Sequence, residues 1–195
     1  LKPDIRYSIS DTPAFKRWFG DSKAVVKDGS PMVLYRGMDS DYGSTMRVSK
    51  DGALGAGIYM TPDPKFAQEY VGQNGNIAPL FASLQNPLVI QHKSNEDPMV
   101  VALVKLGMTE QKARSLVEKA YEEKGYVGKQ VMNRALAQGF DGLMQYRNGN
   151  LSEVVAFSKT QVKSAIGNRG TFDPYNPDIR YSLRDDFITK FGQAD

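Results

Sequence analysis

The order of its apolar patterns constrains this chain more than any other feature. One long stretch has helical spacing, at 110–123, where apolar side chains recur every three or four residues. Short strand-like runs precede and follow it, at 31–35, 58–60, 79–84, 88–91, 142–146, 153–157 and 161–166. Because strands and helices do not alternate regularly, the pattern predicts an α+β fold with mostly antiparallel strands and flanking helices.

Three further helices are predicted from their start and stop signals. Thr12-Pro13 and Thr61-Pro62 each place a capping hydroxyl before a proline, which suits the first turn of a helix. These helices should run to about Phe19 and Tyr70, and a third should span 127–138 and end at Gly139. Residues 38–56, rich in glycine and polar side chains, are expected to form a loop.

Composition excludes several classes of protein. The 195 residues are 41% hydrophobic, enough for a sizeable core, and the net charge of +3 is too small and too dispersed to indicate a nucleic-acid surface. There is no cysteine and one histidine, His92, so thiolate chemistry and a histidine-rich zinc site are excluded and no metal is expected. His92 itself is expected in solvent. No stretch suits a membrane span or a signal peptide, so we expect no membrane association.

A six-residue repeat suggests how the chain is organised. Residues 3–8 recur unchanged as residues 177–182, nearly a whole chain length apart. We interpret the repeat as a boundary marker: 1–10 would be the tail of a preceding unit, 11–166 the domain, and 167–195 a Gly/Asn/Pro-rich closing segment with a short tail. The alternative is a tail strand packed on the domain, and both can hold. The chain also begins with Leu1, so we expect a piece of a longer protein.

Three segments place reactive side chains at or near strand ends. In the first, Arg36-Gly37, a planar cation lies beside bare backbone, which suits phosphate or ribose oxygens and a ligand amide. The alternative is a solvated arginine before a turn. In the second, small residues precede Tyr59, and Tyr70 ends the next helix, so two rings could sandwich a planar heterocycle. The alternative is two tyrosines at the edge of the core.

The third segment is a strand that carries Glu153. On a strand, Glu153 shares a face with Val155 and Phe157, and a carboxylate in line with core positions is unfavourable unless it is paired or used. The alternative is that Glu153 is the first residue of the strand and already lies in solvent. The chain has neither a phosphate-binding GxxxxGK[ST] loop nor a GxGxxG dinucleotide motif.

Together these segments resemble the ADP-ribosyltransferase superfamily, in the branch similar to poly(ADP-ribose) polymerases and diphtheria toxin. Residues 55–60 resemble the Gly-x-Gly-Ile-Tyr-Phe motif of that branch, and Tyr70 follows Tyr59 at the expected spacing. Residues 153–157 resemble its catalytic glutamate strand, and Gln161 follows at the matching position. The flanks, around 15–22 and 161–168, look like the ends of ADP-ribosyltransferase modules in phage polyvalent proteins.

The candidate site departs from this branch at Arg36 and from the arginine-modifying branch at Leu151. Arg36 stands where it has histidine, as in the branch with Arg, Ser and Glu that includes arginine-modifying toxins. Leu151 stands where those toxins have an acidic residue two before the catalytic glutamate. The candidate site is thus a hybrid of Arg36, Tyr59 and Glu153.

The resemblance implies an enzyme, an NAD+-dependent mono-ADP-ribosyltransferase with a split β core, acting on a host macromolecule, preferentially protein. It implies Glu153, Tyr59 and Arg36 as catalytic residues, and it adds Gly37, Tyr70 and Gln161 to Arg36 and Tyr59 as residues that bind NAD+. It needs no metal. It places the protein in a phage virion or the bacterial host cytoplasm, as part of a longer polyprotein with toxin-like action. The alternatives are a silent NAD-binding or structural virion module and a nucleic-acid ADP-ribosyltransferase.

Overall fold

The computed structural model describes residues 9–38, 45–166, 168 and 172–180, and it confirms the α+β class. The strands are β1 (Leu34–Met38), β2 (Ile58–Met60), β3 (Asn76–Ala82), β4 (Pro87–His92), β5 (Gly142–Arg147), β6 (Asn150–Ala156) and β7 (Val162–Ser164). They form a three-stranded sheet of order β1-β3-β7 and a four-stranded sheet of order β2-β6-β5-β4. Pairing is antiparallel except between β4 and β5, which agrees with the mostly antiparallel core predicted from the sequence.

The helices are α2 (Pro13–Phe19), α3 (Pro64–Gln68), α4 (Pro98–Lys105), α5 (Glu110–Lys124), α6 (Gln130–Ala137) and the short 3-10 helix η1 (Lys159–Gln161). At α2 the predicted cap is present, because the Thr12 hydroxyl accepts a hydrogen bond from the Phe15 amide at 3.2 Å. Helix α3 begins later than predicted, with Asp63 as its cap. The reason is that Thr61, the predicted cap, is still bonded to Tyr35 as part of the sheet.

Helix α4 was missed by the periodicity argument, although its start carries the same signal as the others. The Asp97 carboxylate accepts from the amides of Met99 and Val100, and Pro98 occupies the first turn. Eight residues are too few for a clear apolar stripe next to the longer α5. None of the helices in the described ranges has the length and apolar character needed to cross a membrane.

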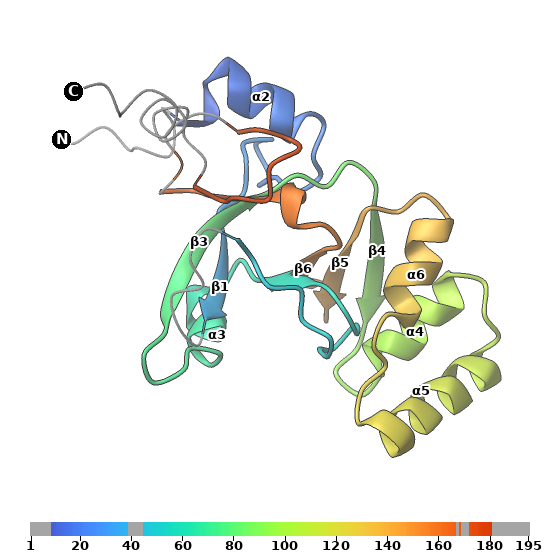
Figure 1. The fold of residues 1–195 in the computed structure, drawn as a ribbon. Helices are drawn as coiled ribbons and strands as arrows, with labels where there is room; N and C mark the ends of the chain where they lie inside the picture. The colour runs from blue at the N-terminus through green and yellow to red at the C-terminus, as the bar shows by residue number, and fades with distance from the viewer. Residues whose placement is uncertain (1–8, 39–44, 167, 169–171, 181–195) are drawn as a thin grey trace, which may run out of the picture.

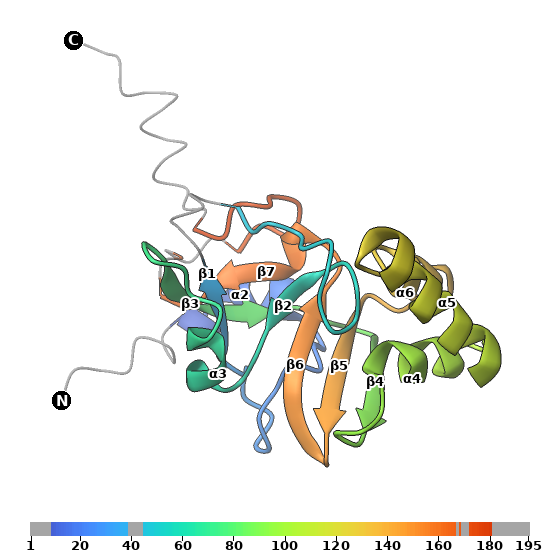
Figure 2. The same cartoon turned by 90° about the horizontal axis from the view of Figure 1, so that it is seen from below.

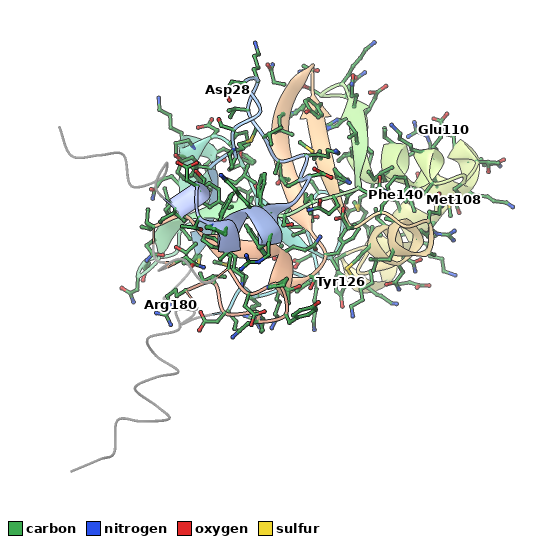
Figure 3. All side chains as sticks on the ribbon, turned by 90° about the horizontal axis from the view of Figure 1, so that it is seen from above. Asp28, Met108, Glu110, Tyr126, Phe140 and Arg180 are labelled. Carbon is green, nitrogen blue, oxygen red and sulfur yellow. The ribbon has the colours of Figure 1, made fainter. Side chains whose placement is uncertain are left out.

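Three groups of buried side chains hold these elements together. The first lies between one face of the four-stranded sheet and α4, α5 and α6, which gather on that side of the sheet (Figures 1 and 2). Phe140 and Met108 pack against this group at the helical end of the molecule (Figure 3). The second lies between the two sheets, and the third joins α2 to the three-stranded sheet through stacked and edge-on aromatic rings.

Strand β1 continues past the predicted end at residue 35. Arg36 pairs with Ala78 and Gly37 with Ile77, so both residues lie inside the strand. On its other edge β1 meets the end of β2, where Tyr35 and Thr61 exchange backbone hydrogen bonds of 2.7 and 2.9 Å. This bridge brings β1 and its neighbour α3 beside the open end of the four-stranded sheet.

Residues 172–180 pack on the domain. The side chains of Phe172 and Ile179 are buried, and the Ile179 carbonyl accepts from the Ser164 amide at 2.9 Å. Lys163 is fully buried, and its ammonium group donates hydrogen bonds to the carbonyls of Asn176 and Asp178 at 2.5 and 2.8 Å. The described part of the second repeat copy, 177–180, therefore contacts the domain, whereas the first copy and residues 181–182 lie outside the described residues.

Candidate active site

A cleft of about 460 Å³ lies between the β1–α3 side and the open end of the four-stranded sheet. Five of the six residues expected from the sequence line it: Arg36, Gly37, Tyr59, Tyr70 and Glu153. They come from β1, β2, the turn after α3, and β6, which are far apart along the chain. The chain therefore brings these side chains together only when both sheets have formed.

Glu153 lies on the face of β6 that the helices cover, just beyond the residues of that face that are buried in the core. Val155 on the same face is buried beneath the helices, and Val154 on the opposite face is buried between the sheets. Glu153 lies across from Gln145 of β5, and a β-bulge follows at once, so that Tyr146 pairs with Leu151. A bulge bends the strand and redirects its side chains. Ser152 and Glu153 both line the cleft, while Leu151 packs into the core between the sheets.

The environment of Glu153 changes its acid strength. Burial raises the pKa of Glu153 to about 7, because the charged carboxylate loses water that the cleft walls do not replace. The carboxyl group is therefore divided between its acid and its ionised forms near neutral pH. Such a group can hold a hydroxyl as an acceptor, and it can also take up a proton during a reaction.

Tyr59 forms a rigid wall of the cleft. Its hydroxyl donates to the Gly55 carbonyl at 2.8 Å and accepts from the Leu54 amide at 2.9 Å. A Cβ atom at Gly52 would lie 2.5 Å from the tyrosine ring, so only glycine lets the loop approach the ring this closely. Burial raises the pKa of Tyr59 far above its usual value, so the phenol stays neutral. Gly52 thus allows the loop before β2 to pack against the Tyr59 ring.

Tyr70 and Gly37 lie on the α3 side. Tyr70 is 59% exposed and meets Phe66 edge-on, with ring centres 5.4 Å apart. A Cβ atom at Gly37 would lie 2.2 Å from the Ala67 carbonyl oxygen, so glycine is needed for α3 to pack on β1. Tyr35 directs its amide and carbonyl away from β3, and by the two-residue alternation of a strand Gly37 directs its own the same way. This backbone is the one expected to meet a ligand amide.

The guanidinium of Arg36 reaches from β1 across to β2 and its preceding loop. It donates to the Tyr59 carbonyl at 2.9 Å, to the Ser49 hydroxyl at 3.2 Å and to the Arg47 carbonyl at 3.4 Å. These bonds orient the guanidinium. Arg36 therefore joins the two sides of the cleft.

Gln161, expected to bind the cofactor, does not line the cleft. Its side-chain oxygen accepts from the amides of Phe157 and Ser158, and its side-chain nitrogen donates to the carbonyls of Asp141 and Ser83. With both ends of the amide engaged by backbone, Gln161 joins η1 to neighbouring loops. The position that matched the family pattern thus has a structural role here.

Among the cleft residues that sequence reasoning missed are His92 and Gln145. The expectation that His92 is solvated is wrong: it is only 7% exposed, and Gln145 is 4% exposed. A ring nitrogen of His92 lies 3.0 Å from the Gln145 side-chain nitrogen. The available signal was alternation, because Leu88, Ile90 and His92 share one face of β4.

The cleft rim carries charges of both signs, from Asp51, Glu96 and Arg147. The Arg147 guanidinium donates to the Ser94 hydroxyl at 3.3 Å, and the Glu96 carboxylate accepts from the Lys93 amide at 2.6 Å. Within the described ranges, no group of three or more His, Cys, Asp or Glu side chains is arranged to hold a metal ion.

Comparison with known proteins gives one family. A solved structure described as an anti-CRISPR protein is similar at 17% identity, covering 68% of this chain and 94% of that one, with a TM-score of 0.35, too low to support an argument. No curated protein matches. Residues 27–172 match the family described as ADP-ribosyltransferase in polyvalent proteins, and this range contains every cleft residue named above. The chain therefore belongs to the ADP-ribosyltransferase family of polyvalent proteins.

Proposed function

We propose that this domain is an NAD+-dependent mono-ADP-ribosyltransferase that cleaves the nicotinamide–ribose bond and transfers ADP-ribose to a host protein. The observation that carries the proposal is the single cleft shared by Arg36, Gly37, Tyr59, Tyr70 and Glu153. The family match supports ADP-ribosyl transfer in general. The use of NAD+, the single transfer and the protein acceptor are the proposed parts. Its place of action is the phage particle or the infected bacterial cell.

The nicotinamide end of NAD+ is assigned to the aromatic side of the cleft. The neutral Tyr59 ring, held by two hydrogen bonds, gives a pre-oriented surface for the flat cationic ring. Tyr70, mostly exposed, covers the ring from the α3 side. The backbone of Gly37 binds the carboxamide. Orientation of this kind lowers the entropic part of the barrier before any bond breaks.

Glu153 is assigned the bond-breaking step. When the bond between the nicotinamide nitrogen and the ribose carbon breaks, its electron pair leaves with nicotinamide, which becomes neutral, and positive charge develops on the ribose. The ionised Glu153 accepts a hydrogen bond from a ribose hydroxyl and stabilises that charge, as carboxylates do in glycoside hydrolysis. The acceptor then bonds to the ribose carbon, and its proton leaves to Glu153 or to water.

Arg36 is assigned to the phosphate side. The planar guanidinium of Arg36, oriented by its hydrogen bonds, suits a phosphate or the adenosine ribose. Arg36 also donates a hydrogen bond to the Tyr59 carbonyl. Binding of a phosphate by Arg36 is therefore coupled to the orientation of the Tyr59 ring. This gives the arginine a role at the position where related enzymes have histidine.

The test uses NAD+ labelled on its adenylate half, incubated with the domain and a bacterial lysate, with nicotinamide release measured in parallel. We expect label on protein and free nicotinamide with wild type, and neither with Glu153→Gln. Glu122→Gln, an exposed change on α5, is the matched control. Equal activity of Glu153→Gln and wild type contradicts the proposal. Binding of NAD+ without nicotinamide release indicates a silent binding module, and label on nucleic acid indicates a different acceptor class.

A further inference from the structure

One buried polar atom in the cleft has no part in the function proposed above. The side-chain oxygen Oε1 of Gln145 is buried and has no hydrogen-bond partner among the described residues. Buried acceptors are nearly always paired, because an unpaired one loses its water without replacement. The other polar groups around Gln145 are used: its backbone carbonyl accepts from the Ser152 hydroxyl at 3.2 Å, and its side-chain nitrogen contacts His92.

The direction of this oxygen follows from the neighbouring histidine. The Nδ1 atom of His92 lies 2.8 Å from the Lys93 carbonyl, which can only accept, so Nδ1 carries the proton. In a neutral imidazole Nε2 is then the acceptor, and it must face a donor. The Gln145 Nε2 amide, at 3.0 Å, supplies that donor. Reversing the amide would set two acceptors against each other, so the hydrogen-bond network holds Oε1 away from His92.

Gln145 also lies beside the proposed catalytic carboxylate. The two residues are direct partners across β5 and β6, so their side chains are neighbours on the same face, and both line the cleft. A group that donates to Oε1 must therefore lie next to the Glu153 carboxyl. Two acceptors side by side suit two neighbouring donors. A phosphate, which only accepts, is unsuited to this end of the cleft.

We propose that Gln145 is a substrate-binding residue whose Oε1 accepts a hydrogen bond from one hydroxyl of the nicotinamide ribose, while Glu153 binds the neighbouring hydroxyl. This assignment rests on the function proposed above. The vicinal hydroxyls of a ribose are two adjacent donors, and they match the two adjacent acceptors. The hydrogen bonds that join Lys93, His92 and Gln145 then position the ribose over Glu153. The phosphates extend toward Arg36.

The test compares wild type with Gln145→Met, which keeps the length of the side chain and removes the acceptor. The control is Gln91→Met, an exposed change on the neighbouring strand β4. Nicotinamide release is measured with NAD+ and with its 2′-deoxy and 3′-deoxy analogues on the nicotinamide ribose. For NAD+ we expect Gln145→Met to lower kcat/KM about tenfold, the size of one lost hydrogen bond. For the analogue that lacks the bound hydroxyl we expect wild type and variant to be equal.

Several outcomes overturn the assignment. One is an unchanged kcat/KM for NAD+ in Gln145→Met; another is the same loss with NAD+ and with both analogues. A third is a shift of the pH profile without any dependence on the ribose hydroxyls, which would mean that Oε1 accepts from the acid form of Glu153 instead. If wild type neither binds nor cleaves NAD+, the proposed function fails together with this assignment. If wild type is active and Gln145→Met equals it, only the assignment fails.

A second measurement covers the case in which Gln145→Met does not fold. In wild-type protein, the 13C resonance of the Gln145 side-chain carbonyl is followed while ADP-ribose is added. A hydrogen bond to Oε1 shifts this resonance at saturation, and ADP-ribose without the corresponding hydroxyl of its terminal ribose leaves it in place. An unchanged resonance at saturating ADP-ribose contradicts the assignment.

Discussion

Gln145 and Glu153 face each other across the β5–β6 pair, at the last regular position before the β-bulge. This relationship puts a neutral amide and an acid with a raised pKa on one face of the sheet, past the end of the helix-covered core. The bulge directs Ser152 and Glu153 into the cleft and leaves Leu151 in the core between the sheets. The chemistry of the site thus depends on one irregularity in strand pairing.

Glu153→Gln should make the protein more stable at alkaline pH. The pKa of Glu153 rises from 4.5 in the unfolded chain to about 7 in the folded one, so the folded state binds the proton more tightly. The resulting stability is complete below pH 4.5 and is lost as pH rises through 7, by about 3 kcal/mol. Thermal melts of wild type and variant should therefore diverge between pH 5 and 8, and Glu122→Gln should follow wild type. Parallel curves would show that Glu153 is not buried as described.

The rate of nicotinamide release should rise with pH. Because the ionised Glu153 stabilises the developing positive charge, kcat/KM for NAD+ should increase through an apparent pKa near 7 and then level off. Gln145 is neutral throughout this range and should not create a second step. The pH profile of kcat/KM is measured at constant ionic strength with wild type and with Glu153→Asp. A flat profile from pH 5 to 9 contradicts the assigned role.

Gly37→Ala should damage packing and binding together. The added methyl would meet the Ala67 carbonyl oxygen at 2.2 Å and push α3 away from β1, at a cost of about 1–3 kcal/mol of stability. Displacing α3 also moves Tyr70, so NAD+ should bind more weakly. Urea unfolding and NAD+ calorimetry check the two effects.

Tyr70→Ala is the contrasting variant for Gly37→Ala. Tyr70 is 59% exposed, so its removal should change stability by about 0.5 kcal/mol or less while weakening NAD+ binding. A stability loss in Tyr70→Ala as large as that in Gly37→Ala would mean that the tyrosine supports the fold and not the ligand.

Lys163 should be coupled energetically to the closing segment. Its buried ammonium binds two carbonyls of residues 176 and 178, so Lys163→Met should destabilise the full chain by about 2–3 kcal/mol. In a chain ending at Asn168 the same change should matter by about 0.5 kcal/mol or less, because water then reaches the ammonium. Unfolding of all four proteins in urea gives the coupling. Equal losses in the long and short chains would show that Lys163 acts independently of the segment.

Local patterns were enough to predict most of the elements. The strand at 58–60 and the helix from residue 110 were placed closely, because alternation and helical spacing depend on neighbouring residues only. The errors occurred where tertiary contacts override local signals. Strand β1 runs on through Arg36 and Gly37 because β3 pairs with it, and α3 starts late because Thr61 bonds Tyr35.

The sequence by itself determined the α+β class, the acid at 153, the aromatic and basic candidates and the family resemblance, since all of these are readable from residue type and spacing. Only the tertiary structure decided which of them share a cleft. It placed Gln161 in a loop junction and brought His92 and Gln145 beside Glu153. The physical reason is that a side chain's hydrogen-bond partners and its loss of water depend on segments 50 or more residues away. Local spacing can indicate that a side chain faces the core, as alternation along β4 does for His92, but it does not identify the partner.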